Sequence, residues 1–378
     1  MFDFSTPITR DYTFKPSLKC GSSYDDDVLL VVKQTSGNGE IWCKNIWGGD
    51  ITINGATVAS GAGIAINLPA GGEEEITYRF SDASTPRTWN KYDSFIQFNG
   101  SAGVGLEFKY ANVDAILNPD GSLPTKAFYR FFAGNGSLGS PITSIANGAF
   151  DFTNVLSIGS NCFQGFLYYY GDKNSNPDNI QGLTSLPDNL FVFPNVTSFT
   201  ASGAFSNMLS SNYKLTSIGN GNFVFPALEQ IADSFNNIAD SPNHPLTTIG
   251  ENCFQFPNLK TFPRVGNYIF AEAFKGSALS SIGHGSFLFP SLESLSRSMM
   301  RCTFEDCANL TALPIGSFNW PMTVVGNGYA AAMCNGMLDN SGVAVPGNGS
   351  VAINAPLKIW NSVLPNIEAG DIWYVNGE

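Results

Sequence analysis

The stretch LTTIGENCFQFPNL, residues 246–259, determines the fold, because its pattern returns along most of the chain. Related stretches begin at Ile142, Leu183, Leu215, Leu279 and Leu310, and successive starts lie 41, 32, 31, 33 and 31 residues apart. A period in this range is typical of a solenoid, in which each unit buries its apolar side only against its neighbours. The sequence therefore predicts a solenoid whose units each form one enlarged coil or two small coils.

Aromatic residues form three columns when the units are aligned, and these columns predict the core. Each buried Phe removes about 150–250 Å² from water, so stacked columns can supply much of the stabilising burial. The first column is Phe150, Phe191, Phe223, Phe254, Phe287 and Phe318; the second is Phe152, Phe193, Phe225, Phe256, Phe289 and Trp320; the third is Phe205, Phe235, Phe274 and Phe304.

Two further aligned positions predict local packing. Gly250 follows the Ile of its unit, but Pro187 takes the same place in another unit. We therefore expect this position to end a strand without needing positive φ. Cys162 and Cys253 both stand in an NCF triplet, and we expect them to share one repeat position as small buried residues.

The composition favours a β protein with a neutral polar surface. Of 378 residues, 43% are hydrophobic and only 13% are charged, against roughly 25% charged in ordinary soluble domains. The net charge of −12 is spread without a run of Lys or Arg, so phosphate neutralisation has little to act on and we expect no nucleic-acid partner. The sequence contains no run of 18 apolar residues, so it does not predict membrane insertion.

Residues 1–110 carry no repeat and predict a separate domain. Short β-rich runs at 27–34, 40–47, 50–59, 63–70, 75–80, 94–100 and 104–113 alternate with Gly, Ser, Asn and Pro. This spacing predicts an antiparallel β-sandwich or a small barrel, which we interpret as a docking or assembly domain. We expect a transition and N-terminal cap at 111–141, the solenoid at 142–337 and a C-terminal cap at 338–378.

The pattern L-x-x-I-G-x-x-x-F-x-F-P-x-L, alternating with an A-F segment, resembles the BspA-like class of leucine-rich repeats over residues 124–337. The resemblance implies a mainly β chain with a leucine-rich-repeat solenoid. It also implies adhesion or partner binding, as in bacterial surface, protozoan or phage proteins, without catalysis. The sequence departs from the family in its longer units and in the Pro after F-x-F, where the family has Cys or another small residue.

Two sets of outward residues are candidate binding surfaces. On the second Leu strand of each unit we interpret four residues as a partner-binding face, namely Ser198, Gln230, Thr261 and Ser294. Hydroxyl residues align in two columns, Thr143, Thr184, Thr216, Thr247, Ser280 and Thr311, and Ser144, Ser185, Ser217, Thr248 and Ser281. Strands about 4.8 Å apart would turn these columns into ladders. The ladders either bind a glycan or a repetitive surface, or simply suit strands and solubilise a face.

The longest interval between units contains two weaker candidates. Oxygen ligands stand at every second position, as in a Ca²⁺-binding loop, at Asp172, Asn174, Asn176 and Asp178. Pro177 replaces the expected Gly, so an ordinary Asn/Asp loop is the alternative to a metal site. Three tyrosines could stack on a sugar or pack in the core, namely Tyr168, Tyr169 and Tyr170. We expect no other cofactor.

Residues suited to catalysis are scarce. His244 and His284 are the two histidines, so a Ser/His/Asp triad or a His-rich metal site has almost no material. Cys302 and Cys307 are close enough in sequence to form a disulfide or can remain free thiols. A carboxylate pair for glycoside hydrolysis is selected by no motif.

These patterns predict a non-enzymatic structural or adhesion protein. The N-terminus shows no export signal, whereas the neutral polar composition suits a protein that faces the outside of a cell or particle. We therefore expect a phage virion component of the tail or capsid surface. Its solenoid would bind a host surface protein or glycan, or a neighbouring subunit, and copies could form a homo-oligomer. The alternatives are a bacterial cell-surface adhesin of BspA type and a carbohydrate-active enzyme.

Overall fold

The computed structural model is mainly β. It describes residues 28–36, 39–45, 49–68, 71–80, 96–98, 105–132, 140, 142–167, 182–210, 212–240, 242–261, 268–293, 302–310 and 318–319. Within these ranges the only helix is the short 3₁₀ helix η1 (Asp114–Ile116), and all other named elements are strands.

In the described part of the chain, eight strands precede the repeats and pair with one another in antiparallel fashion. They are β1 (Val28–Ser36), β2 (Gly39–Lys44), β3 (Ile51–Ile53), β4 (Ala56–Val58), β5 (Gly63–Leu68), β6 (Glu73–Phe80), β7 (Ile96–Phe98) and β8 (Gly105–Ala111). One sheet runs β8-β1-β6-β3-β4, while β2 lies between β5 and β7 in a second sheet. The predicted β-rich runs therefore form strands.

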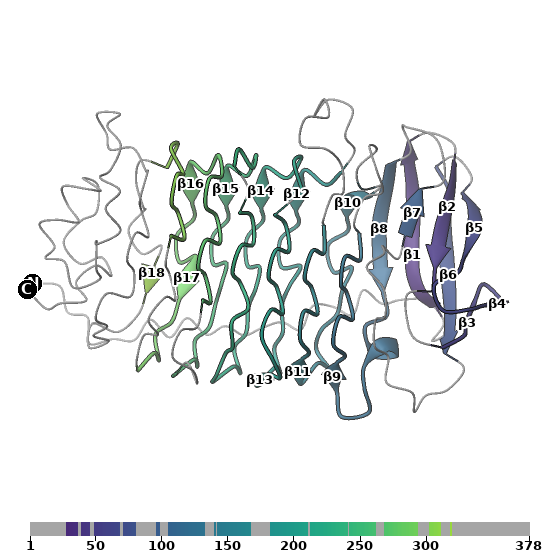
Figure 1. The fold of residues 1–378 in the computed structure, drawn as a ribbon, viewed down its shortest axis with the longest axis horizontal. Coiled ribbons are helices and arrows are strands. Elements are labelled where there is room, and N and C mark those ends of the chain that lie inside the picture. The colour runs from purple at the N-terminus through teal and green to yellow at the C-terminus, as the bar shows by residue number, and fades with distance from the viewer. Residues whose placement is uncertain are drawn as a thin grey trace, which may run out of the picture.

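Strand β8 joins the N-terminal sheet to the solenoid. It pairs antiparallel with β1 and in parallel with β10 (Ile142–Ile145), so that Leu106 stands opposite Ile142. The ring of Phe108 on β8 stacks on Phe150 of the first coil at a centroid distance of 5.2 Å. Buried apolar side chains form one continuous cluster from Leu30 to Leu310. The coils thus stack directly on the N-terminal sheet (Figure 1).

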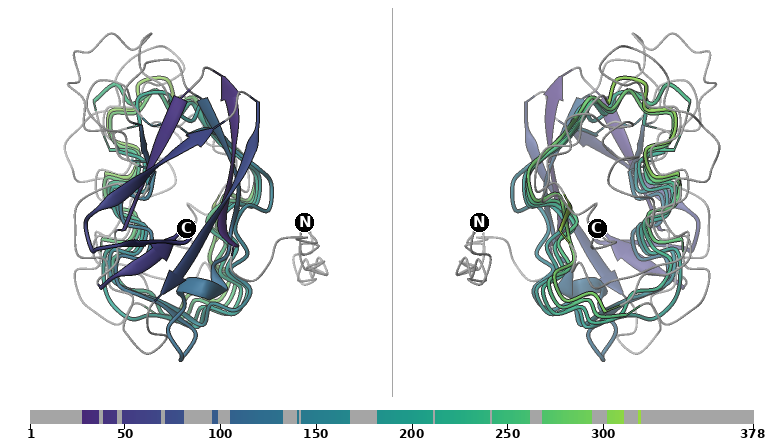
Figure 2. Two further views of the ribbon diagram at one scale, coloured as in Figure 1. Left: turned by 90° about the vertical axis from the view of Figure 1, so that its right-hand side faces the viewer. Right: turned by 90° about the vertical axis from the view of Figure 1, so that its left-hand side faces the viewer.

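Each repeat unit forms one enlarged coil. Along one edge, a parallel sheet contains β12 (Ser185–Leu186), β14 (Ser217–Ile218), β15 (Thr248–Ile249) and β16 (Ser281–Ile282). Along the opposite edge run β9 (Ser122–Leu123), β11 (Ser157–Ile158) and β13 (Ser198–Phe199). Between the edges, β17 (Phe287–Leu288) pairs in parallel with β18 (Phe318–Asn319). Seen end-on, successive coils superpose as an oval ring (Figure 2).

Each coil contains the same local pattern twice. The runs IGSNCF (158–163) and IGENCF (249–254) are nearly identical. They lie on opposite edges, because β11 pairs with β9 and β13 whereas β15 pairs with β14 and β16. The expectation that Cys162 and Cys253 share one repeat position is therefore wrong, although both are buried as predicted.

Stacked phenylalanine rings fill the coils. Centroids lie 4.9–5.1 Å apart in the first column from Phe191 to Phe287. They lie 4.3–5.3 Å apart in the second from Phe152 to Phe289. Both columns are thus confirmed over these ranges.

The third column differs from its predicted register. Phe235 stacks on Phe270 at 5.3 Å rather than on the expected Phe274. Phe274 instead stacks on Phe304 at 5.8 Å. The segment IFAEAF (269–274) carries two Phe residues four apart. The predicted column contained Phe274, which follows Ala, whereas Phe270 is the one that stacks on Phe235.

The glycine after each Ile lets adjacent coils approach closely. Gly219, Gly250 and Gly283 lack positive φ, as predicted. However, an added Cβ at Gly250 would lie 2.7 Å from the backbone nitrogen of Asn220, and one at Gly283 would lie 2.5 Å from that of Glu251. Both distances are shorter than real Cβ contacts, so the position does more than end a strand.

Candidate binding faces

The hydroxyl columns form a face along one edge of the solenoid. We define the hydroxyl face as Thr184, Ser185, Thr216, Ser217, Thr247, Thr248, Ser280 and Ser281, all half-buried or exposed. The parallel register places Ser217 beside Thr248 and Thr248 beside Ser281. The predicted alignment of these eight residues is confirmed. Thr143 and Ser144 instead lie on β10, which pairs with β8 and not with β12, and Thr311 lies outside the described residues.

The two rows of this face differ in their hydrogen bonds. In the first row, Thr216 donates its hydroxyl to the carbonyl oxygen of Thr184 at 3.1 Å, Thr247 to that of Thr216 at 3.0 Å, and Ser280 to that of Thr247 at 3.2 Å. The second row is Ser185, Ser217, Thr248 and Ser281, whose hydroxyls have no hydrogen bond to the described part of the chain. The first row therefore links coils, while the second row faces solvent.

A face of mixed chemistry lies along the opposite edge. We define the mixed face as Leu156, Ser157, Thr197, Ser198, Glu229, Gln230, Lys260, Thr261 and Glu293. Ser157 pairs with Ser198, and Gln230 bridges Thr261. The structure thus places Ser198, Gln230 and Thr261 of the predicted binding face on one edge, whereas Ser294 lies outside the described residues.

Half of this mixed face was not predicted from the sequence. In each segment of this edge two residues point outward between two inward apolar residues, and the predicted binding face contains only the second of them. The first contributes Leu156, which is 49% exposed. It also contributes Lys260, whose Nζ lies 3.5 Å from Oε2 of Glu229. The spacing between the two inward residues was the signal that could have identified them.

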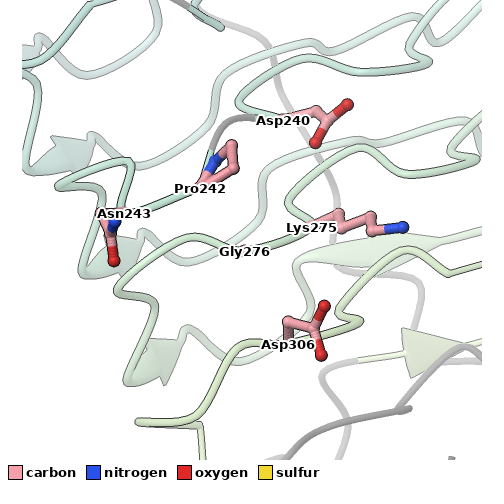
Figure 3. Close-up of a pocket in the computed structure, with 6 residues that line it drawn as sticks. All are labelled: Asp240, Pro242, Asn243, Lys275, Gly276 and Asp306. Carbon is pink, nitrogen blue, oxygen red and sulfur yellow. The ribbon is translucent and has the colours of Figure 1, made fainter. Parts of the chain in front are cut away.

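A small hollow opens at a corner of three coils. It measures about 220 Å³ and is lined by Asp240, Pro242, Asn243, Lys275, Gly276 and Asp306. Figure 3 shows the side chains of Asp240, Lys275 and Asp306 projecting to the same side, one from each coil. Lys275 Nζ lies 2.9 Å from Oε2 of Glu305, and this hydrogen bond raises the pKa of Lys275. The lysine is therefore engaged within the coil stack.

His244 is a buried structural residue. Its Nδ1 accepts a hydrogen bond from the Leu246 N–H at 3.2 Å, and its Nε2 lies 2.9 Å from the Leu209 carbonyl oxygen. Burial lowers the pKa of His244 to about 4, so the ring is neutral. Asn212, in the preceding coil, makes a similar local hydrogen bond, because its Oδ1 accepts from the Lys214 N–H at 3.1 Å.

The described cysteines are buried free thiols. Cys302 and Cys307 are not paired, so the disulfide alternative is wrong. Burial raises the pKa of Cys307 to about 11, and its Sγ donates to the Phe274 carbonyl oxygen at 3.0 Å. A thiol protonated in this way packs rather than reacts.

The remaining predicted candidates fall outside the described residues. They are the proposed Ca²⁺ loop, Asp172, Asn174, Asn176 and Asp178, and the tyrosines Tyr168, Tyr169 and Tyr170. In the ranges that the structure describes, no group of three His, Cys, Asp or Glu residues could hold a metal ion. Nor does any helix there have the length and apolarity to cross a bilayer.

Comparison of the chain with protein-family models, with curated proteins and with solved structures finds no match.

Proposed function

We propose that this chain is a non-enzymatic structural and adhesion protein whose solenoid presents binding faces to a partner. The observation that carries the proposal is the in-register stacking of coils over a continuous phenylalanine core. Such a core fixes the backbone, and it holds outward side chains at regular intervals along two opposite edges. Rigid surfaces of this kind lose little conformational entropy when they bind.

The N-terminal strands fit a docking role in this proposal. Their two antiparallel sheets would form a β-sandwich that attaches the chain to an assembly, with β8 fixing its orientation to the coils. The solenoid would then project toward a host surface or a neighbouring subunit. The resemblance to BspA-like leucine-rich repeats in this proposal rests on the L-x-x-I-G pattern of the sequence, and the coils are longer than that family's.

We further propose that the assembly is a phage virion, with the chain on the tail or capsid surface. Density-gradient purification of particles followed by mass spectrometry tests this location, and the chain should co-purify with intact particles at constant stoichiometry. Recovery only from the cell envelope fraction would instead favour a bacterial adhesin. Release of soluble sugars from host polysaccharide by the purified chain would favour an enzyme.

The mixed face is our candidate for the contact with a protein partner. Replacing Gln230 and Thr261 with Arg should abolish attachment of the purified chain to host cells, because two bulky cations would interrupt this edge. Thr57→Arg with Asn67→Arg is the matched control, since both residues are exposed on the N-terminal strands. Equal attachment by both double variants would exclude the mixed face from the contact.

A further inference from the structure

The uniformity of the hydroxyl face is not required by its backbone. All eight of its outward residues are Ser or Thr. The mixed face has the same arrangement of two outward residues between inward apolar residues, and the same hydrogen bonding between coils. The Thr216 N–H donates to the Thr184 carbonyl oxygen at 2.8 Å, and the Lys260 N–H donates to the Glu229 carbonyl oxygen at 3.1 Å. The first outward position of each segment is Leu, Thr, Glu or Lys on the mixed face, so the strand geometry alone does not select hydroxyl side chains.

The hydrogen bonds within the hydroxyl face fix what it offers a ligand. The first-row hydroxyls of Thr216, Thr247 and Ser280 already donate to carbonyl oxygens of the preceding coil, which leaves their oxygen lone pairs as acceptors. The second-row hydroxyls can rotate to donate or accept. Because neighbouring strands lie about 4.8 Å apart, fixed acceptors and adaptable hydroxyls repeat side by side at that interval.

The chemistry of this face narrows the class of partner. Its eight residues carry no charge, in a chain with 31 acidic and 19 basic residues, so a charged polymer or an anionic membrane gains no electrostatic attraction there. They include no aromatic, Arg or Met side chain, the types that anchor protein interfaces. What remains is hydrogen bonding between hydroxyl groups. Each such bond contributes little against water, so only a ligand that repeats can engage several coils at once.

We propose that the hydroxyl face binds a neutral polysaccharide whose chains are packed into an ordered surface. The inference rests on the proposed adhesion function and names the ligand class for one edge of the solenoid. A neutral polysaccharide offers hydroxyl donors and acceptors at regular intervals, which matches the two rows. The mixed face, by contrast, presents a sequence of side chains that does not repeat.

Co-sedimentation with particulate cellulose and with chitin tests the proposal. The unaltered chain should pellet with at least one of them, and soluble dextran should compete poorly because its chains are not ordered. Ser185→Arg with Ser281→Arg should reduce binding at least tenfold, since the two cations stand at opposite ends of the second row. Ser198→Arg with Gln230→Arg makes the same change on the mixed face and should leave the pelleted fraction unaltered.

A second variant separates hydroxyl chemistry from steric blocking. Ser217→Ala with Thr248→Val removes two second-row hydroxyls while nearly preserving shape, and it should weaken binding severalfold at an unchanged melting temperature. The proposal is wrong if neither polysaccharide pellets the chain, or if both Arg double variants bind equally. It is also wrong if the hydroxyl-face variants convert a dimer to a monomer in sedimentation velocity, or if the face shapes ice crystals instead. Release of soluble sugars would contradict the adhesion function itself, independently of the face.

Discussion

The hydroxyl face and the mixed face lie on opposite edges of the same coils and share one backbone pattern, yet they differ in chemistry. On both edges the inward residues are apolar and fully buried, as Leu246 and Leu259 show. The outward positions are uniform on one edge and varied on the other. This difference teaches that stacking of the coils dictates the interior, while the two exposed positions between the inward residues are free to serve separate partners.

The largest expected effect tests whether the two edges depend equally on close packing. Gly250→Ala on the hydroxyl edge should lower the free energy of unfolding by about 3 kcal/mol, because its Cβ would lie 2.7 Å from the backbone of the preceding coil. Gly159→Ala on the mixed edge should cost a similar amount, since that Cβ would lie 2.6 Å from the Thr125 nitrogen. Chemical denaturation measures both.

A matched control separates crowding from the general cost of replacing glycine. Gly148 has a φ of +72° and no atom within 4 Å of an added Cβ. Asn189 takes the corresponding place in the next coil and adopts a similar φ of 56°. Gly148→Asn should therefore change the free energy of unfolding by less than about 0.5 kcal/mol. If Ala were tolerated at one edge only, the two edges would not share the same packing constraint.

The next effect concerns the buried ring that precedes a strand of the hydroxyl edge. The folded-state pKa of His244 is about 4, below its ordinary value of 6.5, so as the pH falls the unfolded chain binds the proton first. The stabilisation is complete above about pH 6.5 and is lost as the pH falls toward 4, by about 3 kcal/mol. Thermal unfolding across this range measures the loss.

His244→Asn should flatten the acid side of the stability profile. Asparagine can make the local hydrogen bond of His244, as Asn212 shows: its Oδ1 accepts from the Lys214 N–H, and its Nδ2 lies 3.5 Å from the Leu183 carbonyl oxygen. An unchanged slope between pH 6.5 and 4 in this variant would assign the acid loss to other groups.

A smaller effect asks how much the first row of hydroxyls contributes to the fold. Thr247→Val keeps the side-chain shape but removes the hydrogen bond to the Thr216 carbonyl oxygen. Because the site is half-exposed and water can replace the lost donor, the cost should be about 1 kcal/mol or less. A loss of several kcal/mol in denaturant titration would mean that the row is primarily structural, which would weaken its interpretation as a binding surface.

The smallest effect is expected on the mixed face. Glu229 and Lys260 form an ion pair with 61% and 48% of their side chains exposed. Glu229→Gln should therefore change the free energy of unfolding by less than about 0.5 kcal/mol, and less still in high salt. Together with Thr247→Val, this substitution shows whether the outward side chains of either edge contribute to the free energy of unfolding.

Much of the fold could be predicted from the sequence, because the interior of a solenoid repeats. The spacing of Leu215, Leu246 and Leu279 identified the strands that pair in register, and the F-x-F motif located two stacked columns. These features depend only on residues within one unit and on the period, both of which are visible in the printed chain.

The errors arose where the local pattern is ambiguous. Residues 158–163 resemble residues 249–254 so closely that no local feature assigns them to opposite edges; only strand pairing does. The register of Phe270 depends on how many residues its loop contains. The partner of His244, the carbonyl oxygen of Leu209, comes from the preceding coil and could not be identified from sequence neighbours.

The placement of β8 between an antiparallel and a parallel neighbour has a mechanical consequence. A pulling force on the far end of the coils reaches the first sheet through the main-chain hydrogen bonds on both sides of β8. Because the strands lie across the long axis of the coil stack (Figure 1), this load acts along the hydrogen bonds of both ladders and is shared among several bonds at once. The joint thus behaves as a rigid coupling rather than a pivot, and the coils and their base would tilt and withstand tension as a single lever.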